Sequence, residues 1–276
     1  MASLDRFFTP RTLVACHDAG AAQMIIDNTS EDVLRACMLV LRGPATRIFS
    51  NYGSIDVDQP LSLTDVDNVI TGTGWQHTHE FRVLAEADRK GIPNIAVVDR
   101  ATNLQLRFLR GGHTVSPSVI LIPEYEISKL PKGFNKKNIE VFVDDSWLRQ
   151  VETIRRKALQ NPALDSIFIG QPLVDNEGIP DFDIQYRFLR QWLDLQVNGG
   201  LNGFRPHPSD RSTLPADLKH RVVLSDSRTT AIEDISRASA VIGIDSFLLE
   251  LSIEARKKTF RCFVSKNQLK IEEFHR

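Results

Sequence analysis

The stretch AVIGIDSFLLELSIE, residues 240–254, decides which fold this chain is expected to adopt. Its first part is a short apolar run, which predicts a buried strand over Ala240–Ile244. Its second part predicts a helix from Ser246 to Glu254, because serine commonly caps a helix start and mostly apolar residues follow. A strand that leads directly into a helix is the repeating unit of α/β folds with parallel sheets. Ligands of such folds bind at the carboxyl ends of the strands, where Asp245 and Ser246 are expected to lie.

The same alternation of apolar runs and amphipathic stretches extends over the whole chain. It predicts strands over Thr12–Cys16, Cys37–Leu41, Asn68–Thr71, Asn94–Val98, Val119–Ile122, Ile139–Val143, Ser166–Gly170, Gly203–Arg205, Arg221–Leu224, Ala240–Ile244 and, as the last strand, Thr259–Val264. Helices are predicted between them over Ala21–Asn28, Ala45–Tyr52, His79–Lys90, Trp147–Gln160, Asp183–Val197, Thr229–Ala238 and Ser246–Glu254. The pattern therefore predicts an α/β fold of two Rossmann-like halves, residues 1–160 and 161–276, whose parallel sheets face each other across a cleft.

The helix predicted over His79–Lys90 has the clearest pattern in the first half of the chain. Its apolar residues, Phe81, Leu84, Ala85 and Ala87, are expected to share one face that packs on the sheet. The Gly-Ile-Pro sequence that follows is expected to end the helix.

The amino-acid composition limits the classes of protein to which this chain is expected to belong. Of the 276 residues 42% are hydrophobic, which is typical of a globular chain with a substantial core. The 34 lysines and arginines nearly balance 35 aspartates and glutamates, which argues against nucleic-acid binding through overall charge. No signal peptide and no apolar run of about 18 residues is found, so a cytoplasmic protein is expected, a location compatible with peripheral docking on a membrane. The three cysteines lie in apolar runs without metal-ligand spacing, so buried thiols and no metal site are expected.

In the first half, polar residues and glycines follow two of the predicted strands. Asp18 comes after the first strand, where with His17 it offers a general base; its alternative role is to cap the following helix. Gly20 permits a tight turn and close approach of the backbone to a ligand. The loop of Gly72, Thr73, Gly74 and Trp75 could direct backbone N–H groups toward a ligand, and Trp75 could stack on a sugar or base or merely pack.

In the second half, the sequence Arg205-Pro206-His207-Pro208 contains the strongest single candidate. Two prolines restrict the backbone around His207, whose imidazole could offset phosphate charge, donate a proton to a leaving oxygen or form a hydrogen bond to it. Arg205 could pair with the same phosphate, and Ser246 could bind it at a helix N-terminus.

Two further segments of the second half carry polar candidates. Gln171 follows a predicted strand and could contact a base or a hydroxyl group. The acidic turn after it contains Asp175 and Glu177, whose carboxylates could act near the boundary of the two halves, although such a turn is usually only solvated.

The order of these motifs resembles that of the GT-B glycosyltransferases of bacterial surface-polysaccharide synthesis, and among them the bacterial sialyltransferases that use CMP-sialic acid. The resemblance implies that His207-Pro208 is the histidine–proline motif that holds the nucleotide and its phosphate, and that Asp245-Ser246 is the serine motif that binds the same phosphate. It also implies that the acidic turn, which reads Asn-Glu-Gly here, supplies the general base as Glu177, a role for which Asp18 competes.

These observations together predict an inverting, metal-independent transfer of a sugar from a nucleotide donor to a glycan hydroxyl. The first half would bind the acceptor and the second half the donor, with the nucleotide-sugar as substrate and no further cofactor. Two alternatives stay open: a nucleotide-sugar epimerase of the same double-Rossmann shape, and a non-catalytic protein that binds a nucleotide-sugar. The sequence does not indicate the oligomeric state.

Overall fold

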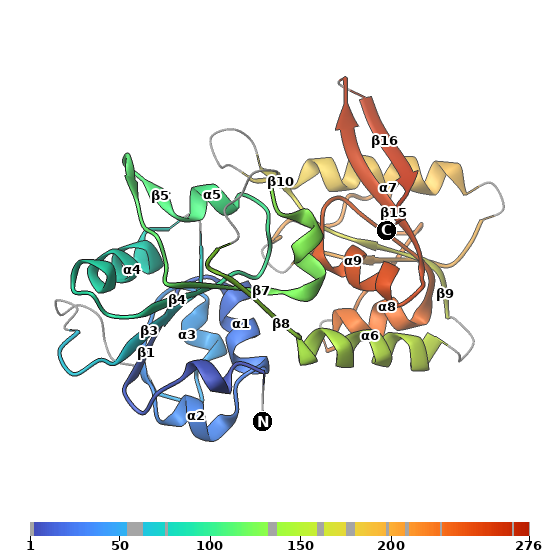
Figure 1. Cartoon of the computed structure of the whole chain (residues 1–276). Helices are drawn as coiled ribbons and strands as arrows, with labels where there is room; N and C mark the ends of the chain where they lie inside the picture. The colour runs from blue at the N-terminus through green and yellow to red at the C-terminus, as the bar shows by residue number, and fades with distance from the viewer. Residues whose placement is uncertain are drawn as a thin grey trace. The chain divides into compact units, whose positions relative to one another are not determined.

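The computed structural model divides the chain into two compact units, Met1–Ser146 and Trp147–Arg276, called the N-terminal and C-terminal units below (Figure 1). The structure describes residues 3–53, 63–74, 77–131, 137–158, 163–174, 180–196, 199–207, 210–226, 228–266 and 268–275. Each unit is a mixed α/β structure built on one six-stranded sheet.

The sheet of the N-terminal unit is parallel throughout and has the strand order β2-β1-β3-β4-β7-β8. Its strands are β1 (Thr12–Cys16), β2 (Met38–Leu41), β3 (Asn68–Thr71), β4 (Asn94–Val97), β7 (Val119–Pro123) and β8 (Ile139–Phe142). Its helices are α1 (Ala19–Asp27), α2 (Glu31–Arg35), α3 (Ala45–Ile48), α4 (His79–Arg89) and α5 (Leu104–Arg107), with short 3-10 turns over Asp5–Phe7 and Glu124–Lys129. A two-stranded hairpin of β5 (Leu109–Arg110) and β6 (His113–Thr114) completes the described part of the unit.

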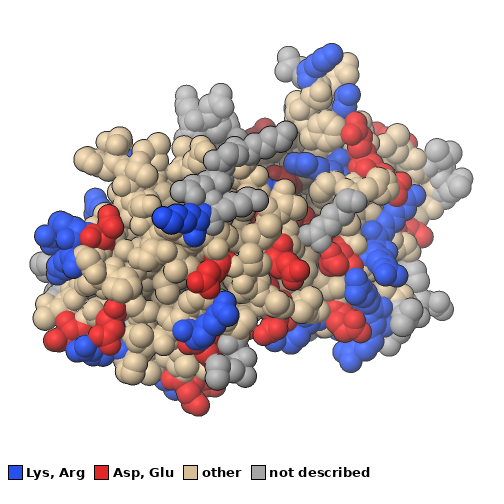
Figure 2. All heavy atoms as spheres, viewed as in Figure 1, with Lys and Arg blue, Asp and Glu red and all other residues tan. Residues whose placement is uncertain are grey.

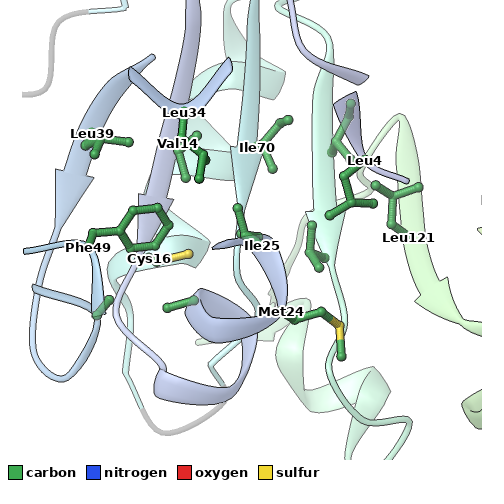
Figure 3. Close-up of a cluster of buried hydrophobic side chains, with 14 of the residues drawn as sticks. Leu4, Val14, Cys16, Met24, Ile25, Leu34, Leu39, Phe49, Ile70 and Leu121 are labelled. Carbon is green, nitrogen blue, oxygen red and sulfur yellow. The ribbon is translucent and has the colours of Figure 1, made fainter. Parts of the chain in front are cut away.

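Both faces of this sheet carry a hydrophobic core, because the side chains of each central strand alternate between them. Val14 and Cys16 of β1 pack on one face with residues of α1, α2 and α3, among them Phe49 (Figure 3). Leu13 and Ala15 of the same strand pack on the other face with α4. All five residues of β1 are buried, as expected of a central parallel strand covered by helices on both sides.

The C-terminal unit has the strand order β13-β12-β9-β14-β15-β16. Its strands are β9 (Leu164–Ile169), β12 (Asn202–Arg205), β13 (Val223–Leu224), β14 (Ala238–Gly243), β15 (Lys258–Ser265) and β16 (Gln268–Glu273), with a separate pair of β10 (Leu173–Val174) and β11 (Pro180–Asp181). Its helices are α6 (Asp145–Ala158), α7 (Asp183–Leu195), α8 (Ala231–Arg237) and α9 (Phe247–Glu254). The pairs within the sheet are parallel except β15 with β16, which is antiparallel.

The α/β class and the parallel sheets predicted from the sequence are confirmed. The predicted strands recur, with ends shifted by a few residues, and so do the predicted helices. The prediction that Thr259–Val264 is the last strand is wrong, because β16 follows it and pairs along its length. The short α2 and α5 and the small two-stranded pairs were not predicted, since segments of two to five residues carry no full hydrophobic period.

The boundary between the units lies earlier than the predicted one at residues 160 and 161. The reason is α6, which buries Trp147, Val151 and Ile154. The Trp147 ring lies edge-on to Phe247 of α9, with ring centroids 5.0 Å apart. Apart from its first two residues, α6 therefore belongs to the C-terminal unit; the predicted linker around residues 159–162 lies outside the described residues.

Lysine and arginine side chains are interspersed with aspartate and glutamate over the surface that Figure 2 shows. This mixture agrees with the formal net charge of -1. Among the described residues, no helix combines the length and the apolar character needed to cross a membrane.

The core of the C-terminal unit depends on the aromatic face of α7. Replacement of the fully buried Phe188 by Ala should lower the free energy of unfolding by about 3–5 kcal/mol, because it removes buried surface and leaves a cavity. Leu195→Ala on the same helix is the matched control, since that side chain is 57% exposed; its effect should stay within about 0.5 kcal/mol. Chemical denaturation monitored by circular dichroism measures both, and equal losses would contradict the assigned core.

Candidate functional site

In the N-terminal unit, the chain turns toward opposite faces of the sheet after the adjacent strands β1 and β3. α1, which follows β1, packs through Ile25 on the face that carries Val14. α4, which follows β3, packs through Val83 on the face that carries Leu13. Adjacent parallel strands whose connections diverge in this way leave a crevice between them, where ligands bind in open α/β sheets.

Asp18 is the N-cap of α1 and also the candidate base of this edge. Its Oδ2 accepts hydrogen bonds from the backbone N–H groups of Gly20 at 3.1 Å and Ala21 at 3.3 Å. Burial raises the pKa of the Asp18 carboxyl, and the nearby negative charge of Asp99 raises it further. The two roles considered for Asp18 are therefore compatible: it caps the helix, and its carboxylate is a stronger base than an exposed one.

Glu80, in the first turn of α4, holds the end of β1 in place. Its Oε1 accepts hydrogen bonds from the backbone N–H groups of His17 at 2.6 Å and Asp18 at 3.1 Å. The residue is only 1% exposed, and its Oε2 is buried without a hydrogen-bond partner. A buried carboxylate oxygen in this state is costly for the fold, which marks it as a feature that requires an explanation.

Asp99, after β4, is held by the buried Arg107. The Nη1 of Arg107 donates to Asp99 Oδ1 at 2.7 Å and to the carbonyl and hydroxyl oxygens of Thr73 at 2.9 and 3.0 Å. Thr73 in turn donates to the carbonyl of Val97. The loops after β3 and β4 are therefore joined through one guanidinium group.

Three glycines at this edge let carboxylates approach the backbone. A Cβ atom at Gly20 would clash with Asp99 Oδ2, and one at Gly72 would lie 2.9 Å from the Cβ of Ala21. A Cβ at Gly74 would lie 3.5 Å from both the Asp18 Cβ and Glu80 Oε2. The absence of a side chain is thus a condition of the arrangement at Gly20 and Gly72, whereas a Cβ at Gly74 would be in ordinary contact.

His17 borders the carboxylates on the side of β2. Its ring stacks on that of His77, with centroids 3.7 Å apart, and lies against Gly43, where a Cβ would be 2.5 Å from His17 Nε2. Burial lowers the pKa of His17, and the neighbouring His77 lowers it further. His17 is therefore neutral at pH 7, and it can accept or donate a hydrogen bond but does not offset the negative charge nearby.

In the C-terminal unit, β9 and β14 form the corresponding point of divergence. β9 leads to α7, which packs on the face of Phe168 and Ile242. β14 leads to α9, whose Leu249 side chain would be 3.3 Å from a Cβ atom at Gly243, on the opposite face. Gln171, Asp245 and Ser246 follow these two strands at their carboxyl ends, as predicted.

Gly170 directly follows β9 and is in close contact with the loop after β12. A Cβ atom there would lie 2.9 Å from the carbonyl oxygen of Arg205, 3.0 Å from the His207 nitrogen and 2.6 Å from Gln185 Oε1. Gln185 is fully buried and donates from Nε2 to Asp210, while its Oε1 has no partner. Gln185 was not among the residues that the sequence singled out.

His207 lies directly after β12, half-buried beside the ring of Phe182 at a centroid distance of 6.3 Å. Burial lowers the pKa of His207, so the imidazole is neutral at pH 7. Of the roles predicted for it, a hydrogen bond to a phosphate oxygen fits this state better than charge compensation. Pro208 lies outside the described residues.

Arg205 forms a structural ion pair with Asp234. Its Nη1 donates to Asp234 Oδ2 at 2.5 Å and to the carbonyl of Thr229 at 3.0 Å, and Ser225 also donates to Asp234. Asp234 is buried and Arg205 is mostly so. The prediction that Arg205 pairs with a phosphate therefore needs revision, because a phosphate would have to compete with a buried carboxylate.

Ser246 caps α9, since its Oγ accepts a hydrogen bond from the Leu248 N–H at 3.2 Å. Arg261 of β15 stands opposite Gly243 in the register and forms a long, exposed ion pair of 3.4 Å with Asp245. An anion at the α9 N-terminus would meet the Ser246 hydroxyl, the positive end of the helix dipole and an arginine whose present ion pair is weak. Arg261 was missed because the sequence does not reveal which residue of a neighbouring strand faces a loop.

The structure thus sorts the predicted residues into two sets. Asp18, Gly20, Gly72, Thr73 and Gly74 lie together in the N-terminal unit, and Gln171, Arg205, His207, Asp245 and Ser246 follow neighbouring strands of the C-terminal unit. Trp75, Asp175 and Glu177 lie outside the described residues. No protein-family model and no curated protein matches the chain. Within the described ranges, no group of three or more His, Cys, Asp or Glu side chains is arranged to hold a metal ion.

Replacement of Asp18 by Asn should stabilise the protein at pH 7. Asparagine caps a helix as well as aspartate does, while the substitution removes a charge that burial and Asp99 disfavour. Because the pKa of Asp18 is raised in the fold, its cost is present above that pKa and vanishes as the pH falls below the unfolded value of 3.8.

Differential scanning calorimetry at pH 7 and pH 4 measures this effect. The Tm gain of Asp18→Asn should shrink at the lower pH, and Asp88→Asn, an exposed position on α4, should show neither effect. A loss of stability at pH 7 would show that the Asp18 charge is not disfavoured.

Proposed function

We propose that this protein is a glycosyltransferase that takes a sugar from a nucleotide donor bound in the C-terminal unit and transfers it to an acceptor bound in the N-terminal unit. The observation that carries the proposal is the opposite chemistry of the two sheet edges. The carboxylates of Asp18 and Glu80 meet at the β1–β3 edge, whereas a capped helix N-terminus, an imidazole and the Arg261–Asp245 ion pair lie near the carboxyl ends of β12 and β14. Phosphate is repelled by the first and attracted by the second.

The donor side is supported by the groups that follow β12 and β14. The Ser246 hydroxyl, which lies at the positive end of the α9 dipole, can donate a hydrogen bond to a phosphate, and neutral His207 can donate another. Arg261 supplies the positive charge that Arg205, paired with Asp234, does not. These groups would also stabilise the negative charge that develops on the phosphate as the sugar leaves.

The acceptor side is supported by Asp18. In the proposed reaction its carboxylate takes the proton of the acceptor hydroxyl while that oxygen forms a bond to the anomeric carbon. The bond from the anomeric carbon to the phosphate oxygen breaks, its electron pair leaves with the nucleotide, and the configuration inverts. The raised pKa of Asp18 strengthens it as a base for this step.

The proposal includes the GT-B arrangement of two domains and a donor of the CMP-sialic acid kind. Its support is the motif order of the C-terminal unit, in which His207 precedes Asp245 and Ser246, together with two parallel sheets of Rossmann-like type. Asp18 is preferred to Glu177 as the base because its surroundings raise its pKa.

Incubation with CMP-, UDP- and GDP-sugars and a mixture of glycan acceptors tests the reaction. Asp18→Asn should lower kcat by about 10²- to 10⁴-fold, because general-base catalysis contributes that much, and should leave donor affinity unchanged. Asp88→Asn should retain the wild-type rate. Chromatography of the products measures both.

Two results would decide against the transferase, and a third would decide against its proposed base. Nucleotide-sugar conversion to an epimerised sugar without an acceptor would identify an epimerase, and tight binding without turnover would identify a binding protein. Full activity of Asp18→Asn would remove Asp18 from the mechanism.

Ser246→Ala should weaken nucleotide binding roughly tenfold, because it removes one hydrogen bond to phosphate. It should also lower the free energy of unfolding by about 1 kcal/mol through loss of the α9 cap. Thr230→Ala is the matched control, since Thr230 caps α8 of the same unit in a capping box with Glu233. Calorimetry should show a similar stability loss for both variants and weakened CMP binding only for Ser246→Ala; equal CMP affinities would contradict the phosphate site.

A further inference from the structure

The carboxylates of Asp18, Glu80 and Asp99, here called the carboxylate cluster, form a group of acidic side chains in the N-terminal unit that the Arg107–Asp99 ion pair compensates only in part. Asp18 and Asp99 both place an Oδ2 atom against Gly20, and Glu80 binds the backbone N–H of Asp18. Arg107 directs its Nη1 to Asp99 and to Thr73, so it acts on Asp18 through its charge and not through a hydrogen bond. The neighbouring His17 is neutral at pH 7 and adds no positive charge.

Glu80 provides a second and independent observation. One of its oxygens is used twice by backbone N–H groups, and the other, Oε2, is buried without a partner in a residue that is 1% exposed. Fold stability alone does not explain this choice, because glutamine at this position could accept the same two hydrogen bonds without a charge. The remaining oxygen points to a ligand that donates a hydrogen bond.

Two glycines lie against the carboxylate cluster. A side chain at Gly74 would begin 3.5 Å from Glu80 Oε2 and 3.5 Å from the Asp18 Cβ. A side chain at Gly20 would collide with Asp99 Oδ2 and approach Asp18 Oδ2 to 3.2 Å. The cluster therefore packs directly on glycine backbone from the segments after β1 and β3.

We propose that the carboxylate cluster binds a protonated primary amine, so that the acceptor is a sugar that carries one free amino group close to the reacting hydroxyl. An ammonium group offers three N–H donors and one positive charge, which match a group of carboxylates in which one oxygen lacks a partner. The inference rests on the proposed glycosyl transfer and specifies its acceptor. A phosphorylated or carboxylated acceptor meets like charges at this edge, and a neutral sugar adds no positive charge to that of Arg107.

Ligand-observed NMR with D-glucosamine, without any donor, tests the inference on the full chain. D-glucose, N-acetyl-D-glucosamine and D-glucose 6-phosphate serve as matched neutral and anionic probes, and MgCl₂ as a second cation. Glucosamine should bind at pH 7 at least about tenfold more tightly than each of the other sugars, because charge-assisted hydrogen bonds are the stronger ones.

Two variants of the cluster and one control complete the experiment. Asp18→Asn and Asp99→Asn should each weaken glucosamine binding by about tenfold, and Asp88→Asn on the exposed side of α4 should leave it unchanged. Both cluster variants keep a side-chain oxygen for the existing hydrogen bonds, and calorimetry verifies their folding.

Equal binding of glucose and glucosamine, displacement of glucosamine by Mg²⁺ at equal concentration, or wild-type affinity in both variants would overturn the inference. Since no donor is present, these outcomes are separate from failure of the proposed transfer. A chain that binds glucosamine but consumes no nucleotide-sugar retains the amine site and loses the transferase. A chain that glycosylates neutral acceptors and does not bind glucosamine retains the transferase and loses the amine site.

Discussion

The carboxylate of Glu80 organises the edge of the N-terminal sheet where the connections after β1 and β3 diverge. Glu80 belongs to α4, on one face of the sheet, and accepts the backbone N–H groups that follow β1, whose own helix lies on the other face. A carboxylate buried this deeply is tolerated only with hydrogen bonds, and two of them fix the turn that carries His17 and Asp18. The position of the candidate base therefore depends on a residue more than sixty positions away in the sequence.

The two sheet edges divide the chemistry of the proposed reaction by charge. A base that must remain ionised and a phosphate that must be held cannot share one small site without raising the cost of both. In the proposed reaction the base belongs to one sheet, and Ser246, His207 and Arg261, the groups proposed to hold the phosphate, belong to the other. Within the C-terminal unit the two arginines differ in their partners. Arg205 forms an ion pair with the buried Asp234, so Arg261 is the arginine beside the α9 N-terminus.

Much of the fold could be predicted from the sequence because parallel strands buried on both faces are continuous apolar runs, as in β1 and β14. Helix caps were equally readable: Asp18 and Ser246 each cap the helix that follows a strand. The sequence does not show which side chains meet across the sheet. For this reason Arg261 was overlooked, and Arg205 was predicted to bind phosphate.

Glu80 is a different case, because the sequence did carry a signal for it. Together with Val83, Leu84 and Ala87 it occupies the helical positions that face the sheet, and the expected face had instead included Phe81 and Ala85. A glutamate at the spacing of a buried helical face is unusual enough to mark a polar site. The boundary near residue 160 was misplaced for a related reason: the apolar spacing of α6 shows that it packs, but not against which sheet.

Arg107 has a consequence for the way this edge moves. Its guanidinium group joins the carbonyl oxygens of Thr73 and Thr102 and the carboxylate of Asp99, so it crosslinks the segments that follow β3 and β4. Opening either segment alone would leave the buried Arg107 charge without some of its partners, which costs far more free energy than releasing an exposed loop. The two segments should therefore open together, as one cooperative unit in amide hydrogen exchange, and the edge that holds Asp18 should stay closed until that whole unit opens.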